Sequence, residues 1–206
     1  MTNATCGGFG IGDVAVTSAF DVDVSKIGLD LSDAIWRSPN NALKFVEVPR
    51  VGVPVVEGIL SDGVGNGYSQ KISARGKANV EDVVAHLKAT DTHVPVNFLP
   101  VGSQRASELY AKAALAAGCA FINCIPSRLA RTDSWRERFM QAGLPLVGDD
   151  LESQFGSTLV HHALMDVLTR NGVQLSRTYQ IVSGGNMDFL NMQDPDRIVS
   201  KKVLKV

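Results

Sequence analysis

The sequence has few cysteines, no long apolar run and almost no net charge, and each of these absences excludes a class of protein. Three cysteines in 206 residues cannot form the disulfide framework of a small secreted domain. Cys119 and Cys124 lie in an apolar segment, where buried reduced thiols are expected. No apolar run reaches the roughly 20 residues that a membrane-spanning helix needs. Residues 1–12 have neither the basic nor the apolar region of a secretory signal, so a cytoplasmic protein is predicted.

The charge balance excludes two further classes. The formal net charge is -1, so the sequence has no excess of basic residues that would favour binding to nucleic acid or to an acidic membrane surface. Hydrophobic residues make up 45% of the chain and charged residues 20%, which is typical of a globular protein. The length suits one substantial domain, or one domain and the start of another.

Strand-like and helix-like segments alternate along the chain. Apolar, β-branched segments predict strands at residues 13–20, 42–56, 94–99, 120–124, 144–147 and 174–183. Helical spacing and capping residues predict helices at residues 26–36, 79–88, 103–118, 132–143 and 156–170. Alternation with short connections is typical of a parallel sheet with right-handed crossovers. An α/β fold of the Rossmann-like, doubly wound type is therefore expected.

The strand that ends at Asp21 has the character of the second strand of a dinucleotide-binding fold. In such folds an acid at this strand end accepts hydrogen bonds from a ribose, about 20 residues after a glycine-rich phosphate loop. Too little sequence precedes Asp21 to hold a strand, a turn and a helix. The glycine cluster at residues 6–12 has no strand before it, so it is interpreted as a flexible lead-in. We therefore expect a sheet that lacks the first βα unit.

Several short motifs occur in a characteristic order. They are residues 19–23 (AFDVD), 26–34 (KIGLDLSDA), 99–103 (LPVGS), 123–126 (NCIP), 147–154 (VGDDLESQ), 184–191 (GGNMDFLN) and 200–205 (SKKVLK). In sequence, order and separation they resemble the myo-inositol phosphate synthases of bacteria and archaea. Residues 147–154 and 184–191 are the most specific of these motifs. Agreement in several separate segments makes coincidence a poor explanation.

The resemblance implies a domain organisation and an oligomeric state. Residues 1–183 would form part of an NAD-binding Rossmann-like domain, and residues 184–206 would begin the catalytic and oligomerisation region. The family is homo-oligomeric and tetramer-forming. Its opening strand, its glycine-rich loop and the sheet used for oligomerisation are not recognised in this sequence. The family also usually has a lysine where this sequence has Glu152, and a carboxylate there would repel a substrate phosphate.

The resemblance also implies a reaction without net redox change, in which glucose 6-phosphate becomes inositol phosphate for inositol and phospholipid synthesis. The sugar is oxidised with NAD, forms an enolate, closes its ring by aldol addition and is reduced again. Such chemistry needs cations beside developing oxyanions and groups that move protons. Lys201 and Lys205 are four residues apart and share one face of a helix, which suits these roles. Asp150 is the third catalytic candidate.

Cofactor and substrate residues follow from the same resemblance. The candidates for the NAD site are Asp21, Asp30, Thr90, Tyr110, Ser153, Asp188 and Lys201. Ser153 and Gln154 precede a predicted helix, whose N-terminal amides favour a substrate phosphate. From the residues alone, a capping or surface role for Asp30 has the same standing as a cofactor role. Tyr110 lies mid-helix, where an aromatic is more often part of the core, and only the resemblance makes it a cofactor candidate. A monovalent or divalent cation beside Asp149 and Asp150 is a further option, although no metal site is predicted from ligand spacing.

Two other functions stay open. The chain can be a truncated or degenerate relative that binds sugar phosphates or other chains without turnover. It can also be a different NAD-dependent dehydrogenase, although the 147–154 and 184–191 motifs would then be unexplained. Without the glycine-rich loop we expect weak NAD binding, and we expect the chain alone to be inactive or nearly so.

Overall fold

The computed structural model describes residues 5–39, 43–65, 69, 71–151, 156–184 and 186–204, with the backbone alone for 200–204. Two compact units divide the chain: unit 1 comprises Met1–Asp150 with Asn186–Val206, and unit 2 comprises Leu151–Gly185. The domain boundary that the sequence suggests, between residues 183 and 184, stays a prediction, and each unit is described by itself.

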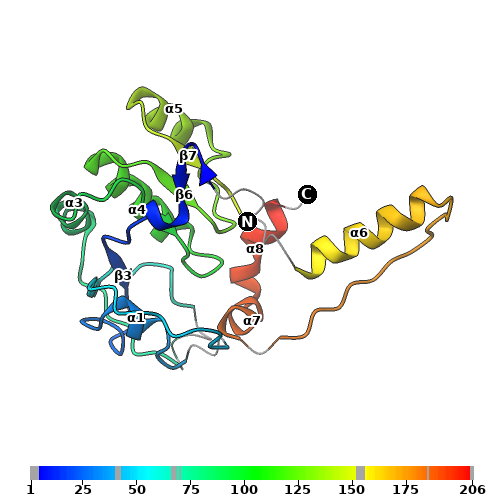
Figure 1. The fold of residues 1–206 in the computed structure, drawn as a ribbon, viewed down its shortest axis with the longest axis horizontal. Helices are drawn as coiled ribbons and strands as arrows, with labels where there is room; N and C mark the ends of the chain where they lie inside the picture. Colours follow the sequence, from blue (N-terminus) through cyan, green and yellow to red (C-terminus); the bar gives the residue numbers. More distant parts are fainter. Residues whose placement is uncertain are drawn as a thin grey trace. The chain divides into compact units, whose positions relative to one another are not determined.

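Unit 1 contains two small parallel sheets (Figure 1). In the first, β3 (Ala19–Asp21) pairs with β4 (Val55–Glu57). In the second, β6 (Phe121–Asn123) lies between β5 (Val96–Asn97) and β7 (Leu146–Val147). Parallel pairing with helical crossovers agrees with the Rossmann-like class expected from the sequence.

Helices connect these strands and supply most of the core. They are α1 (Leu31–Ala34), α3 (Val80–Ala89), α4 (Gln104–Ala117), α5 (Asp133–Gln141), α7 (Met187–Met192) and α8 (Pro195–Leu204). The helices α3 and α4 pack against each other, and four alanines of α4 are fully buried, which lets the two helices approach closely. Phe121 and Phe139 are each 1% exposed and fill the space beside them. Within the described residues, no helix is both long and apolar enough to cross a membrane.

Local capping explains where two of these helices begin and end. Asn79 accepts a hydrogen bond from the amide of Asp82 at 3.0 Å, and the Asp82 carboxylate accepts one from the amide of Asn79 at 3.0 Å. This reciprocal pair is a capping box and fixes the start of α3. Gly118 ends α4 with φ +81°, a left-handed conformation that glycine adopts without strain. Both boundaries were predicted from the sequence.

Four residues lie at or just after the ends of strands. Asp21 is the last residue of β3 and Asn123 is the last residue of β6. Leu99 follows the end of β5 by two residues, and Gly148 follows β7 directly. Because β5, β6 and β7 are parallel, the last three of these residues gather at one edge of their sheet, here called the C-terminal edge.

Several local predictions were wrong. Residues 43–54, predicted to be strand, form only an isolated bridge at Pro54, and β4 begins at Val55. Residues 14–18 form no strand, and β3 begins only at Ala19. The glycine cluster is an ordered hairpin in which β1 (Thr5–Cys6) pairs with β2 (Phe9–Gly10), and a 3-10 turn η1 (Ile11–Asp13) follows. Residues 174–183 are extended but pair with no strand in the described part of the chain. An alternating apolar pattern indicates an extended backbone, but it cannot supply a partner strand.

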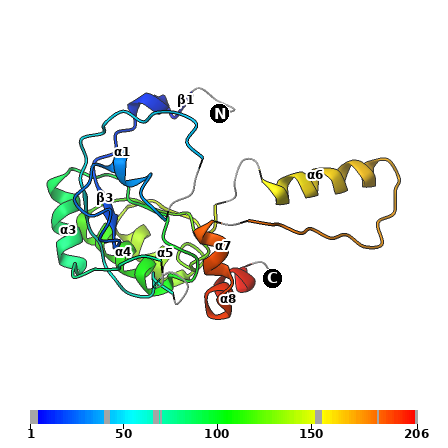
Figure 2. The same ribbon diagram turned by 90° about the horizontal axis from the view of Figure 1, so that it is seen from below.

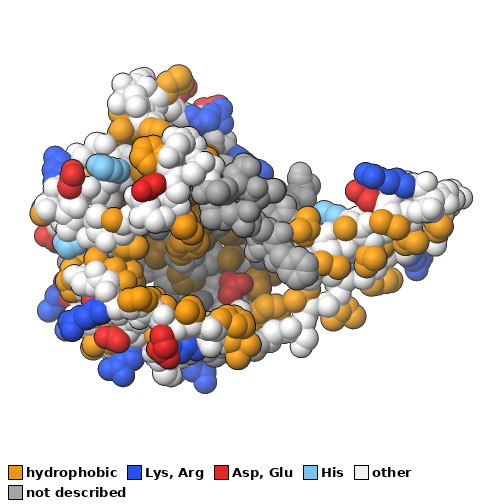
Figure 3. Space-filling view, viewed as in Figure 1, with side chains coloured by type: hydrophobic (Ala, Val, Ile, Leu, Met, Phe, Trp, Pro, Cys, Tyr) orange, Lys and Arg blue, Asp and Glu red, His pale blue; other side chains and the backbone are white. Residues whose placement is uncertain are grey.

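Unit 2 is a helix with an extended return. α6 (Ser157–Arg170) matches the predicted helix, and the chain after it runs back along the helix (Figures 1 and 2). The Gln180 amide donates to the Ser157 hydroxyl at 2.9 Å, and the side chains of Thr178 and His161 are 2.7 Å apart. Hydrophobic side chains run along this unit in the space-filling view (Figure 3), and no residue of α6 is buried.

Candidate functional site

Two asparagines join the C-terminal ends of β5 and β6. The Asn97 amide donates to the Asn123 side-chain oxygen at 2.8 Å and to the Ser107 hydroxyl at 3.0 Å. Asn97 is 5% exposed, and Asn123 and Ser107 are fully buried. Since buried polar groups are costly unless they are hydrogen-bonded, this chain of bonds fixes the strand ends relative to α4.

Asp149 continues this network after β7. Its carboxylate accepts from the Asn123 amide at 2.7 Å and is 7% exposed. It also accepts from the backbone amides of Leu129, Ala130 and Arg131 at 3.0, 3.0 and 3.2 Å. A single buried carboxylate therefore holds the loop after β6 against the end of β7. Both oxygens of the carboxylate accept these hydrogen bonds, so the role of Asp149 in the structure is to shape the C-terminal edge.

Asp150 is the member of the pair that remains accessible. It is half-buried, and its backbone has φ +59°, an uncommon value for a residue with a side chain. Its amide donates to the Ile125 carbonyl at 3.1 Å, which joins it to the end of β6. Gly148 has no room for a side chain, because a Cβ there would stand 2.9 Å from the Asn123 carbonyl oxygen. This close approach brings Asp150 to the C-terminal edge.

The helix that carries Lys201 is fastened to the same edge. Arg197, in the first turn of α8, is 7% exposed, and its guanidinium donates to the carbonyls of Asp62, Gly63 and Gly102. Its Nε donates to the side-chain oxygen of Asn191 in α7 at 3.1 Å. The Asn191 amide donates in turn to the Val101 carbonyl at 2.8 Å. Arg197 and Asn191 thereby tie α7 and α8 to the loop after β5.

Asp62 organises the start of α4. Its two carboxylate oxygens accept from the amides of Arg105 and Ala106, each at 2.8 Å. The sequence predicted Ser103 as the capping residue, but the Ser103 hydroxyl donates to the Pro100 carbonyl instead. A carboxylate from a distant loop therefore satisfies the amides at this helix N-terminus.

Asp21 lies where a ribose-recognising acid is expected, at the end of β3. One of its oxygens accepts from the amides of Val22 and Asp23, and the other lies 3.1 Å from the Lys26 ammonium. Its side chain is 31% exposed, and the oxygen beside Lys26 keeps a lone pair that a hydroxyl group can reach. Tyr110 lies behind this strand end and tilts against Phe20.

Tyr110 is a core residue in this structure. Its hydroxyl accepts from the Ile59 amide at 2.9 Å, and a Cβ at Gly58 would meet that hydroxyl at 2.5 Å. Burial raises the pKa of the Tyr110 phenol to about 12. Of the two interpretations left open by the sequence, core packing describes what Tyr110 does in the structure.

Asp30 caps α1. Its carboxylate accepts from the amide and hydroxyl of Ser32 at 3.0 and 2.6 Å, and from the amides of Val51 and Gly52 at 3.2 and 2.7 Å. The Ser32 hydroxyl is the main reason why the pKa of Asp30 falls to about 2, and the amides lower it further against the opposing effect of burial. The capping alternative is thus the one that the geometry supports.

Thr90 lies at the opposite edge of the sheet. It is the C-cap of α3, its hydroxyl donates to the His86 carbonyl at 2.8 Å, and it lies 2.8 Å from the Thr92 hydroxyl. These residues precede β5, so they stand at the N-terminal ends of the parallel strands. The structure therefore does not bring Thr90 together with Asp21 or Asp150.

The remaining candidates come from the last two helices and from undescribed positions. Asp188 is exposed in the first turn of α7, which Asn186 caps by accepting from the Phe189 amide at 3.0 Å. The backbone of Lys201 belongs to α8. Ser153, Gln154, Glu152 and Lys205 lie outside the described residues.

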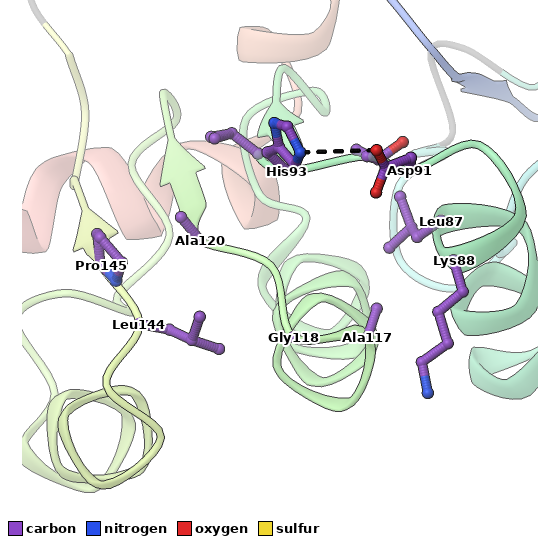
Figure 4. A pocket seen from close by; sticks show the side chains of 11 residues that line it. Leu87, Lys88, Asp91, His93, Ala117, Gly118, Ala120, Leu144 and Pro145 are labelled. Carbon is purple, nitrogen blue, oxygen red and sulfur yellow. Dashed lines mark ion pairs between the residues drawn. The ribbon is translucent and has the colours of Figure 1, made fainter.

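One pocket lies away from these residues. It has a volume of about 430 Å³ and opens at the N-terminal ends of β5, β6 and β7, between the ends of α3 and α4 (Figure 4). Leu144 and Ala117 contribute apolar surface, and His93 lies 3.9 Å from Asp91 (Figure 4). Ligands of open parallel sheets bind at the carboxyl ends of strands, so we do not assign the candidate site to this pocket.

The residues fit a dinucleotide in part. Asp21 has a free lone pair at the end of β3, where a ribose would stand, and the C-terminal edge offers polar groups for the reactive half. The described residues include no glycine-rich turn between a strand and a helix N-terminus, since the glycine cluster at residues 6–12 forms a hairpin turn and η1. The group of three or more ligands that a metal ion needs is also not found in the described part of the chain.

Sequence reasoning missed the residues that build this edge. Asn97 carried a weak signal, because it is an amide inside an apolar strand. Asp62 lies in a glycine-rich loop and Arg197 in a short acidic segment, and neither position has a signature of its own. Their partners are distant in sequence, so that Arg197 contacts a carbonyl 135 residues away.

Comparison with known proteins links the chain to enzymes of inositol metabolism. A family model described as Myo-inositol-1-phosphate synthase matches residues 156–206. The inositol-3-phosphate synthase of Corynebacterium glutamicum is 44% identical over 97% of this chain, and that of Mycolicibacterium smegmatis is 45% identical over the same share. The chain spans about half the length of these curated relatives, 54% in each case.

Solved structures give the same fold. The crystal structure of Ari2 aligns with a TM-score of 0.79 and 36% identity, and the match covers 94% of this chain and 56% of that chain. A myo-inositol-1-phosphate synthase-related protein from Thermotoga maritima aligns with a TM-score of 0.71 over 95% of this chain. Its sequence identity is 24%, so this second likeness bears on the fold alone.

Proposed function

The chain belongs to the myo-inositol phosphate synthase family, and from this premise we propose that it binds glucose 6-phosphate at the C-terminal edge and serves its NAD-dependent conversion to inositol phosphate. One observation carries the proposal. The helix that bears Lys201 is tied by Arg197 to the loop after β5, and Asp150 follows β7 at the same edge of the same sheet. A reaction of a sugar phosphate needs cationic and acidic groups together at one place.

Each residue has a proposed task. Lys201 and Lys205 would stabilise oxyanions at the sugar carbonyl carbons and move protons during enolisation and ring closure. Asp150 would accept or return a proton in the same steps. From the resemblance, Ser153 and Gln154 would bind the substrate phosphate. The negative charge of Glu152 works against that phosphate and would weaken its binding.

The cofactor would be held from two sides. Asp21 would accept hydrogen bonds from the adenosine ribose, while Asp188 and Lys201 would stand near the nicotinamide. Bound NAD supplies a reversible hydride acceptor, and this makes the sugar carbon acidic enough to enolise. Tyr110 and Asp30 contribute indirectly, since one packs behind the Asp21 strand end and the other caps α1.

The first test is substrate binding to the chain as it stands. Glucose 6-phosphate is titrated into the ¹⁵N-labelled chain, and amide chemical shifts are followed with glucose as the control. We expect saturable shifts at residues 99–103 and 148–150, and much smaller ones with glucose. If neither region responds to millimolar glucose 6-phosphate, the proposed substrate is wrong.

The second test is turnover. The chain is incubated with NAD and glucose 6-phosphate, and inositol phosphate is measured by mass spectrometry. We expect little or no product from the isolated chain, because misplacement of the nicotinamide by about 1 Å can cost a hundredfold in rate. Any product should disappear with Lys201→Ala and persist with Lys202→Ala, the matched control. Product that survives Lys201→Ala would overturn the mechanism.

A further inference from the structure

Arg197 is a buried cation that is held by two separate loops. Its guanidinium donates to the carbonyls of Asp62 and Gly63, the latter at 3.1 Å, and to the Gly102 carbonyl at 3.3 Å. It also lies 3.3 Å from the Ser103 hydroxyl. The planar fork of an arginine can satisfy several carbonyls at once, which a lysine ammonium on a flexible stem cannot match.

Two glycines make room for this side chain. A Cβ at Gly102 would stand 3.0 Å from the Arg197 Nε, and a Cβ at Gly65 would stand 3.1 Å from its Cδ. Both approaches are tighter than ordinary contacts. The loops on either side of the arginine are therefore shaped around it, and a buried guanidinium would be costly without these partners.

The place of Arg197 on α8 gives this contact a consequence. Lys201 follows it by four residues, so the two Cα atoms lie on one helical face about 6 Å apart along the axis. The hydrogen bonds of Arg197 hold the first turn of α8 in place, and the next turn carries Lys201. The backbone of Lys201 continues a helix that is anchored by buried hydrogen bonds.

We propose that Arg197 is a positioning residue for Lys201. Its guanidinium holds the first turn of α8 against the loops at residues 61–65 and 100–103, and this contact fixes where Lys201 stands at the C-terminal edge. The role in catalysis rests on the proposed function, but the positioning itself does not. The planar guanidinium donates several hydrogen bonds in fixed directions. A lysine at position 197 would keep the charge but could not make the same set of hydrogen bonds.

The test reads the environment of Lys201 in the full chain without any ligand. Amine acetylation at pH 8 is followed by mass spectrometry, and the rate at Lys201 is divided by the rate at its neighbour Lys202. We expect both Arg197→Lys and Arg197→Met to change this rate ratio at least twofold, whereas the exposed control Asp196→Asn should leave it unchanged.

Folding is monitored separately. Amide exchange of α3 and α4 reports the core, and that of residues 198–204 reports α8. In the Arg197 variants we expect amide exchange in α8 to be at least tenfold faster than in the unsubstituted chain, with no change in α3 and α4. Should the Arg197 variants unfold, Asn191→Ala removes one hydrogen-bond partner of Arg197 and should change the acetylation rate ratio in the same direction. An unchanged ratio in folded Arg197→Lys and Arg197→Met would overturn the proposal.

The outcome is separable from the fate of the proposed function. A changed Lys201 acetylation ratio in the variants, together with no binding of glucose 6-phosphate, would support the positioning role of Arg197 and rule out the proposed substrate. If the substrate binds but the variants have no effect on Lys201, the positioning role of Arg197 is wrong and the proposed substrate stands.

Discussion

Replacing Asp149 with asparagine isolates the contribution of one buried carboxylate. Asparagine has nearly the same shape, but it presents an NH₂ group where the carboxylate has its second oxygen. One oxygen accepts from Asn123 and Ala130, and the other accepts from the amides of Leu129 and Arg131. Whichever way the new amide turns, two buried donors face another donor.

The expected loss follows from these unsatisfied groups. A buried donor without an acceptor costs about 1–3 kcal/mol, so Asp149→Asn should destabilise the fold by about 2–6 kcal/mol. For a protein of this size, about 1 kcal/mol corresponds to roughly 2–4 °C in melting temperature, which predicts a fall of about 5–20 °C. Circular dichroism melting at pH 7 measures the effect, and amide exchange should accelerate first at Leu129 and Arg131.

Asp133→Asn is the matched control, because this aspartate lies at the surface with a side chain 79% exposed. Surface substitutions change stability by about 0.5 kcal/mol or less, so its melting temperature should move by about 2 °C or less. A fall of under 2 °C for Asp149→Asn would refute the reasoning, since it would show that the carboxylate is not needed to hold the loop.

Four further outcomes are expected. The pKa of Asp30 is lowered to about 2, so its stabilising effect should be complete above about pH 4 and be lost as the pH falls towards 2. In Asp30→Asn the melting temperature should therefore depend less on pH over that window, and an unchanged slope would contradict this. Tyr110→Phe leaves the Ile59 amide without its acceptor and should cost about 1–3 kcal/mol by denaturant unfolding, with phenol ionisation at 295 nm near pH 12 in the unsubstituted chain. Gly148→Ala should lower the melting temperature by several degrees, because its Cβ would stand 2.9 Å from a carbonyl oxygen. Calorimetry on the chain should show weak NAD binding, because its described residues form no glycine-rich turn between a strand and a helix. Two charge-assisted contacts fewer reduce affinity by about a hundredfold or more, and a low-micromolar Kd would disprove this.

The sequence predicted the parts of the fold that depend on local chemistry. Asn79 and Gly118 mark helix ends through their own side chain or backbone freedom, and the structure has both helix ends where they were expected. Polar residues after apolar strands marked the C-terminal edge, because parallel strands end at the same side of a sheet. The strand ends at Asp21 and Asn123 were found in this way.

The features that could not be predicted from the sequence depend on contacts between residues distant in the chain. Ser103 occupies a capping position, yet the distant Asp62 provides the cap. Residues 174–183 have a strand-like pattern, but pairing requires a partner that no local pattern reveals. Arg197 has no local signature, because its partners are brought to it only by the folded loops at residues 61–65 and 100–103.

The position of β5 at the border of its sheet has a consequence for handling the protein in solution. Its outer side pairs with no other strand in the described part of the chain, and Val94, Val96 and Phe98 are 41%, 47% and 78% exposed beside it. Unpaired peptide groups next to apolar side chains are a template for intermolecular β-pairing. Concentrated samples should therefore self-associate through this border, and a charge at Phe98 (Phe98→Lys) should raise solubility while leaving the core intact.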